Sequence, residues 1–157
     1  MPDIFAGQGK AGGVRLYTIG FTKTTAADFF GRLQSAGVQR IVDVRLNPDG
    51  QLSGFANRDD LAFFAERLCG IGYRHAPELA PTKPMFDEYK KLKGPWPDYE
   101  AKFLKLIAER HIETTETPAD LDGGCLLCSE DVPHHCHRRL VAEYLKDRWG
   151  GVEIVHL

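Results

Sequence analysis

The sequence predicts a single α/β domain with a mostly parallel sheet of about four or five strands and helices on both faces. Two observations lead to this prediction. Short apolar and β-branched runs alternate with longer segments of helical spacing almost throughout the chain, which is the order that βαβ units produce. The 157 residues, 43% of them hydrophobic, can form one domain with its own core and leave little room for a second.

The first half of the chain supplies three of the expected strands. Residues 15–20 form a β-rich run that stops at a glycine, residues 40–45 form a second run, and a brief strand is expected around residues 73–75. Between them, a helix with a threonine cap is expected over residues 24–37, and another over residues 59–68.

The second half begins with a proline-rich loop over residues 77–84, and two helices are expected over residues 85–92 and 97–110. Residues 114–124 read as a polar connection. A buried strand is then expected at Cys125–Cys128, followed by a loop, a helix that runs to about Trp149 and a last strand over residues 152–155.

The net charge, the length of the apolar runs and the first residues of the chain bear on its partners and its location. The formal net charge is −2, which does not require a polyanionic partner. No apolar run approaches the roughly 18 residues of a membrane span. Residues 1–13 are glycine-rich and lack the apolar core of a secretory signal, so we expect a mobile tail before a domain at residues 14–157, in a cytoplasmic protein.

The expected fold also predicts where a site should lie. In open parallel sheets, ligands bind in the crevice beyond the carboxyl ends of the strands. This rule selects Gly20–Thr22, Asp43–Arg45 and Cys128–Glu130, all of which are polar or glycine-rich. We therefore expect these three segments to form the walls of one crevice.

The densest chemistry lies between Cys125 and Arg139, where cysteines and histidines cluster. One interpretation is zinc, held by Cys125, Cys128, Cys136 and His137. The local pattern disfavours it, because a strand places Cys125 and Cys128 on opposite faces. With no signal peptide and three of the four cysteines within twelve residues, we expect thiols in a reducing compartment.

A second interpretation is a thiol site. Cys128 ends a strand and precedes a helix whose N-terminus favours an anion, so a thiolate there would be reactive. Glu130 and His137 would handle protons, and Cys136 would be a resolving thiol or a wall residue. The third interpretation is ordinary packing, since a helical wheel turns His137 toward the sheet in either case.

Two further sets of residues have alternative interpretations. Asp43 and Arg45 share a strand face, so they either pair with each other or bind an anionic ligand. Lysines beside the proline-rich loop, with Trp96 and Tyr99 nearby, form either a solvated face or a nucleic-acid-binding surface. These lysines are Lys83, Lys90, Lys91 and Lys93.

Several of these segments together resemble the DUF488 family over roughly residues 15–157. The most specific part is Leu127–Glu130 with Cys136–Arg138. The resemblance implies a set of characteristic polar residues, with Phe21 where the family often has histidine. The set is Thr18, Gly20, Asp43, Arg45, Cys128, Glu130, Cys136, His137 and Arg138. The Asp-Val-Arg strand and the cysteine before a helix also resemble rhodanese-like domains by analogy.

The leading hypothesis is an enzyme or enzyme-like domain that binds an anionic, phosphate-bearing small molecule or nucleotide. Arg45 and Arg138 would hold the anion, with Thr18, Gly20 and Asp43 as further ligand-binding residues. Cys128, Glu130 and His137 would be the catalytic groups. The alternatives are a nucleic-acid-binding module without catalysis and a zinc-stabilised structural domain.

Overall fold

The computed structural model describes residues 13–49, 51–130 and 132–157. The expected tail of residues 1–13 lies outside this range except for its last residue. Within the described residues, five strands form one parallel sheet in the order β4-β3-β5-β2-β6. The strands are β2 (Val14–Gly20), β3 (Arg40–Asp43), β4 (Gly72–His75), β5 (Gly124–Cys128) and β6 (Val152–His156). The predicted α/β class and the parallel sheet are confirmed.

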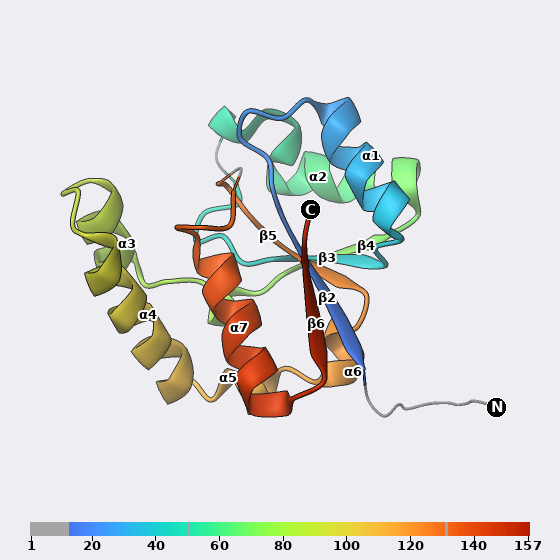
Figure 1. Ribbon diagram of the computed structural model, residues 1–157. Helices are drawn as coiled ribbons and strands as arrows, with labels where there is room; N and C mark the ends of the chain where they lie inside the picture. Colours follow the sequence, from blue (N-terminus) through green and yellow to red (C-terminus); the bar gives the residue numbers. More distant parts are fainter. Residues whose placement is uncertain (1–12, 50, 131) are drawn as a thin grey trace.

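Helices cover both faces of this sheet (Figure 1). One face carries α1 and α2, and the other carries α4, α5 and α7, with α3 packed against α4. The α-helices are α1 (Ala26–Ala36), α2 (Arg58–Phe64), α3 (Lys83–Lys90), α4 (Trp96–Glu109), α5 (Ile112–Thr115), α6 (Pro118–Leu121) and α7 (His137–Trp149). Shorter turns are η1 (Gln51–Ala56), η2 (Ala65–Cys69) and η3 (Pro77–Leu79).

The alternation of side chains along β5 divides the interior into two cores. Leu126 and Cys128 pack with α4 and α7, whereas Cys125 and Leu127 pack with α1 and α2. Both sides of this strand are fully buried, as expected for the central strand of a parallel sheet. The expectation that Cys125 and Cys128 lie on opposite faces is therefore confirmed.

Local signals account for the boundaries of α1. The side chain of Thr25 accepts a hydrogen bond from the backbone N–H of Asp28, and Gly37 ends the helix in the left-handed conformation with φ of 76°. A glycine adopts this conformation without the steric penalty of a Cβ, so it is a common helix stop. The predicted helix over residues 24–37 is thus confirmed.

The connection expected over residues 114–124 is wrong, because α6 lies within it and the end of α5 overlaps it. Thr117 caps α6 by accepting a hydrogen bond from the Asp120 N–H, and Pro118 occupies its first turn. Ile112 and Leu121 are fully buried and anchor the two short helices on the core. Their polar neighbours face outward, which concealed these turns in the sequence.

Two other boundaries differ from the prediction. The strand expected over residues 40–45 ends at Asp43, whose carboxylate accepts a hydrogen bond from the N–H of Arg45 and turns the chain. The helix expected over residues 59–68 ends as an α-helix at Phe64 and continues through η2. No helix in the described part of the chain is both long and apolar enough to cross a lipid bilayer.

The two-core arrangement generates a test of stability. Leu126→Ala removes a fully buried side chain from the central strand and should lower the free energy of unfolding by about 2–5 kcal/mol. Leu92→Ala, at a position that is 78% exposed, is the control and should change it by less than about 0.5 kcal/mol. Urea denaturation followed by circular dichroism measures both, and equal effects would contradict the arrangement.

Candidate functional site

The candidate site lies at the carboxyl edge of the sheet, where three adjacent strands end. β3, β5 and β2 are neighbours, and their pairing sets Gly20 beside Cys128 and Asp43 beside Leu127. The three segments that the sequence selected therefore meet at one edge of the sheet.

The loop that follows β5 is bound tightly to the end of β2. The Ser129 carbonyl accepts hydrogen bonds from the N–H groups of Phe21 and Thr22 and from the Thr22 hydroxyl, the last at 2.8 Å. A Cβ on Gly20 would lie 1.5 Å from the carbonyl oxygen of Glu130. Gly20 is thus required for the close approach of this loop, because it has no side chain in the space that the loop occupies.

Arg138 lies behind this loop and is fully buried. Its Nη1 donates to the Glu130 carbonyl oxygen at 2.6 Å and lies 3.5 Å from the sulfur of Cys128. The guanidinium is not among the residues that line the cavity of the site. Arg138 therefore holds the loop and faces the sulfur, rather than reaching the cavity as an anion-binding side chain.

The structure pairs Cys128 with Cys136 in a disulfide, so the expectation that both are free thiols is wrong. Cys128 ends β5, and Cys136 is the N-cap residue of α7. The strand end and the helix start point toward the same hollow, which the spacing of the two residues alone did not show. Cys69 and Cys125 are the free cysteines among the described residues.

The four candidate zinc ligands are not assembled in one place. Cys125 packs in the core between the sheet and α1, on the far side of β5 from Cys128. The two sulfurs of Cys128 and Cys136 and a ring nitrogen of His137 do lie within 4.8 Å of one another. Three of the four expected ligands thus converge, and the fourth does not.

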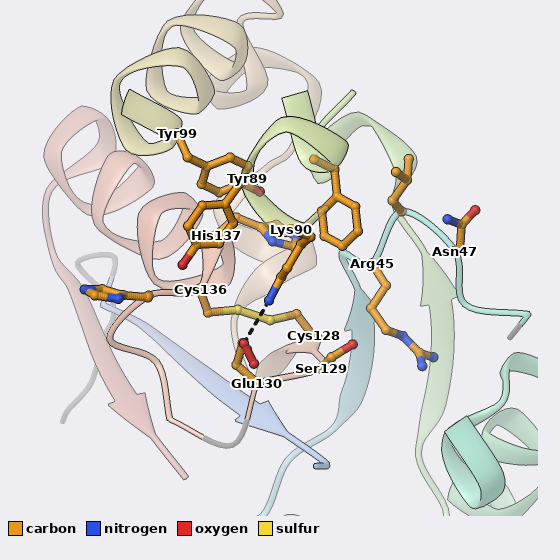
Figure 2. Close-up of a pocket in the computed structure, with 13 residues that line it drawn as sticks. Arg45, Asn47, Tyr89, Lys90, Tyr99, Cys128, Ser129, Glu130, Cys136 and His137 are labelled. Atoms are coloured by element: carbon orange, nitrogen blue, oxygen red, sulfur yellow. Dashed lines mark hydrogen bonds and ion pairs between the residues drawn. A yellow bond between two sulfur atoms is a disulfide. The ribbon is translucent and has the colours of Figure 1, made fainter. Parts of the chain in front are cut away.

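A cavity of about 120 Å³ opens above the disulfide (Figure 2). Its walls come from the ends of β3 and β5, the start of α7, and the inner faces of α3 and α4. The lining residues are Arg45, Leu46, Asn47, Phe86, Tyr89, Lys90, Tyr99, Cys128, Ser129, Glu130, His135, Cys136 and His137. Cys128, Glu130, His137 and Arg45 therefore share one cavity, as the sequence led us to expect.

Besides Arg45, the charged side chains that line this cavity are Lys90 and Glu130. The Lys90 ammonium lies 3.0 Å from a carboxylate oxygen of Glu130, and Figure 2 shows this pair beside the disulfide. The two side chains are 40% and 37% exposed, so water reaches the pair from the outside. Burial raises the pKa of Tyr99, whose hydroxyl therefore stays protonated on the opposite wall.

His137 is buried at the first position of α7. Its Nε2 donates a hydrogen bond to the Val44 carbonyl at 2.6 Å, and its ring lies edge-on to Phe103. Burial lowers the pKa of His137 to about 4. The imidazole is therefore neutral at pH 7, with the proton on Nε2, which makes it a weak general base at that pH.

Asp43 and Arg45 form a buried ion pair with each other. Arg45 donates from Nε and Nη2 to the two carboxylate oxygens of Asp43 at 2.9 and 2.7 Å, and the Tyr73 hydroxyl donates to the same carboxylate. The guanidinium also lies 5.3 Å from the ring centroid of Phe21. Figure 2 shows the side chain of Arg45 directed away from Lys90. The Arg45 guanidinium is therefore paired with the Asp43 carboxylate.

Thr18 lies within the sheet, two residues before the end of β2. It is fully buried, and its hydroxyl is 2.6 Å from Nδ1 of His156 on the adjacent strand. Thr18, Gly20 and Asp43 are absent from the cavity lining. These three residues support the walls from behind.

Sequence reasoning missed the outer wall of the cavity, formed by Phe86, Tyr89 and Tyr99. The sequence left Lys90 either on a solvated face or on a surface for nucleic acid, and Tyr99 either in core packing or on that surface. In the structure Lys90 pairs with Glu130, while Lys83 and Lys91 pair with Asp87. The remaining aromatic side chain, Trp96, packs against Tyr89, Tyr99 and His135. No local pattern in the sequence indicates that α3 folds back over the end of β5.

The close contact at Gly20 can be tested directly. Gly20→Ala places a methyl group on the Glu130 carbonyl and should lower the free energy of unfolding by about 2–4 kcal/mol, since the backbone of the loop must shift. Gly31→Ala, where a Cβ meets nothing within 4 Å, is the matched control and should leave stability unchanged or raised. Thermal unfolding measures both, and an unaffected Gly20→Ala protein would contradict this packing.

The neutral state of His137 predicts a pH dependence. The unfolded chain protonates this imidazole near pH 6.5 and the folded protein only near pH 4. Its contribution of about 3 kcal/mol is therefore complete above pH 6.5 and is lost as the pH falls toward 4. His137→Gln should flatten the stability profile in this window, whereas His134→Gln should not. Urea midpoints between pH 4 and 7.5 measure the slope, and identical slopes would contradict the assignment.

Comparison with known proteins gives one match. The family model of DUF488, a domain of unknown function, matches residues 25–145 and so includes the Cys128–Arg138 segment. A search of curated proteins and a search of solved structures gave no match. Because the family model covers most of the chain, this protein belongs to the DUF488 family.

Proposed function

We propose that this protein is a thiol-dependent enzyme that acts on a small anionic ligand, with the Cys128 thiolate as nucleophile. The observation that carries the proposal is the position of Cys128. Its sulfur lies 3.5 Å from a buried guanidinium nitrogen and lines a cavity that also contains an ammonium group. Buried cationic groups next to a cysteine favour the thiolate, which is the reactive form.

The surroundings of Arg138 support this role. The guanidinium is fully buried, and the Nη1 that faces the Cys128 sulfur also donates to the Glu130 carbonyl, which holds its orientation. A cation that cannot move into solvent keeps its full interaction with a nearby sulfur, because little water screens it. In the reduced protein, Arg138 would therefore stabilise the negative charge on Cys128.

Lys90 is the group that best suits an anionic ligand. Its ammonium is at the mouth of the cavity, where it forms a partly exposed pair with Glu130 and lies 5.4 Å from the ring centroid of Tyr89. Such pairs contribute little free energy, so a ligand carboxylate or phosphate could take the place of Glu130. This assigns to Lys90 the role that the sequence gave to Arg45 and Arg138, whose charges are directed elsewhere.

Proton transfer falls to Glu130 in this proposal. Its carboxylate faces the cavity and becomes free when a ligand anion binds Lys90. His137 is neutral and tied to the Val44 carbonyl, so it positions the wall next to the sulfurs. The aromatic wall of Phe86, Tyr89 and Tyr99 would hold the apolar part of the ligand.

Alkylation of the reduced protein tests this proposal without knowledge of the substrate. We expect iodoacetate, an anion, to modify Cys128 faster than Cys69. We also expect the ratio of the iodoacetate rate to the rate with neutral iodoacetamide to be higher for Cys128 than for the thiol of glutathione. Lys90→Ala should lower the iodoacetate rate about fivefold, the equivalent of ~1 kcal/mol, and leave the iodoacetamide rate unchanged. Peptide mapping by mass spectrometry at timed intervals measures each rate.

The chain offers a matched control for Lys90. Lys102 forms a similarly exposed pair with Glu88 at 2.6 Å and is outside the cavity lining, so Lys102→Ala should change neither rate. If Cys128 reacts no faster than Cys69, Cys128 is not the nucleophile. If Lys90→Ala slows both reagents equally, or neither, the anion-binding role of Lys90 is wrong.

A further inference from the structure

We infer that Cys128 and Cys136 form a reversible dithiol–disulfide couple, and that the protein reduces small disulfides that carry a carboxylate. This inference rests on the proposed nucleophile and anion-binding group, and it adds the reaction and the class of substrate. The observation behind it is that the disulfide lies in the wall of the cavity, beside Lys90 and Glu130.

The site holds the two cysteines near each other without help from their bond. After Cys128, the backbone of Ser129 and Glu130 is fixed by three hydrogen bonds to the Ser129 carbonyl and by the hydrogen bond from Arg138 to the Glu130 carbonyl. Cys136 is fixed separately, because its own carbonyl accepts from Arg139 at the start of α7. The reduced protein therefore keeps both sulfurs in the cavity, where each can reach the other.

The backbone also suits the open form of the pair. The Cα atoms of Cys128 and Cys136 are 7.4 Å apart, whereas most disulfides span about 4.4–6.8 Å. Two separate thiols fit this spacing without further movement of the chain. The spacing of the two Cα atoms is therefore compatible with the open form of the pair.

Each sulfur has its own source of stabilisation as a thiolate. Cys128 faces the Arg138 guanidinium, and Cys136 caps the thirteen-residue helix α7, whose N-terminus favours negative charge. A stabilised thiolate both attacks and leaves readily in thiol–disulfide exchange. We assign the first attack to Cys128, because the buried guanidinium is the stronger of the two sources.

The reaction then balances in two steps. The Cys128 thiolate attacks one sulfur of the substrate disulfide, the substrate S–S bond breaks, and one thiolate leaves. The Cys136 thiolate next attacks the sulfur of Cys128, which releases the second substrate thiolate and forms the Cys128–Cys136 disulfide. Two electrons pass from the protein to the substrate, and the two thiol protons of the protein end on the released thiols. An external dithiol returns the protein to its reduced form.

The experiment uses reduced full-length protein and two matched disulfides, dithiodiglycolate, which carries carboxylates, and neutral bis(2-hydroxyethyl) disulfide. We expect the wild type to form the Cys128–Cys136 disulfide and to be reduced again by dithiothreitol while folded. Cys136→Ser should stop at a stable mixed disulfide on Cys128. Cys69→Ser should behave as the wild type. Intact mass and peptide mapping identify each species.

The rates with the two disulfides test the class of substrate. We expect the ratio of the oxidation rate with dithiodiglycolate to the rate with the neutral disulfide to be about fivefold higher for the wild type than for glutathione. Lys90→Ala should abolish this preference. Lys102→Ala should retain it. Equal rates with the wild type would overturn the assignment of an anionic substrate.

Other outcomes would overturn the couple itself. A wild type that keeps the mixed disulfide, or a Cys136→Ser protein that never forms one, would contradict it. A Cys128–Cys136 disulfide that dithiothreitol cannot reduce in the folded protein would also contradict it. The same holds for a reduced protein that resists the oxidants because zinc is bound to Cys128, Cys136 and His137. In any of these cases, rapid alkylation of Cys128 by iodoacetate would leave the proposed function standing, whereas slow alkylation would remove both.

Discussion

The site depends on the place of one carbonyl oxygen, that of Glu130. It occupies the space next to Gly20 in which any other residue would have a side chain, and it accepts a hydrogen bond from the buried Arg138. This contact closes the loop after β5 onto the end of β2. The loop in turn sets Cys128 opposite Cys136 and presents the Glu130 carboxylate to Lys90.

The buried charges show how the fold keeps this edge rigid. Asp43 is fully buried, and its two carboxylate oxygens are taken up by Arg45 and Tyr73, while the Arg138 guanidinium is satisfied in part by a carbonyl. A buried charge is tolerated only when it is paired and hydrogen-bonded. These buried charged residues therefore fix the walls of the cavity, whereas the pair of Lys90 and Glu130 is partly exposed to solvent.

Much of this molecule follows from patterns that act over short distances. The apolar runs, the threonine caps and Gly37 predict the strands and α1, and the rule for parallel sheets places the site at the ends of β2, β3 and β5. The pairing of Asp43 with Arg45 was one of the two interpretations that their shared strand face allowed, and the structure confirms it. The contact of Arg138 with the Glu130 carbonyl could not be predicted, because it is set by the folded loop. The place of Lys90 in the cavity was missed for a similar reason, since α3 is held there by its packing on α4, which in turn packs on α7. The short helices α5 and α6 carry too few apolar residues to show a period.

The position of Cys125 has a consequence for oxidation of the protein. Cys125 and Cys128 are three residues apart in β5, yet the sheet separates their sulfurs, and Cys125 is fully buried in the opposite core. Thiol exchange requires the attacking and the attacked sulfur to touch. Scrambling of the Cys128–Cys136 bond onto Cys125 would thus require the central strand to leave the sheet. The β-sheet therefore keeps the Cys125 thiol apart from the Cys128–Cys136 pair.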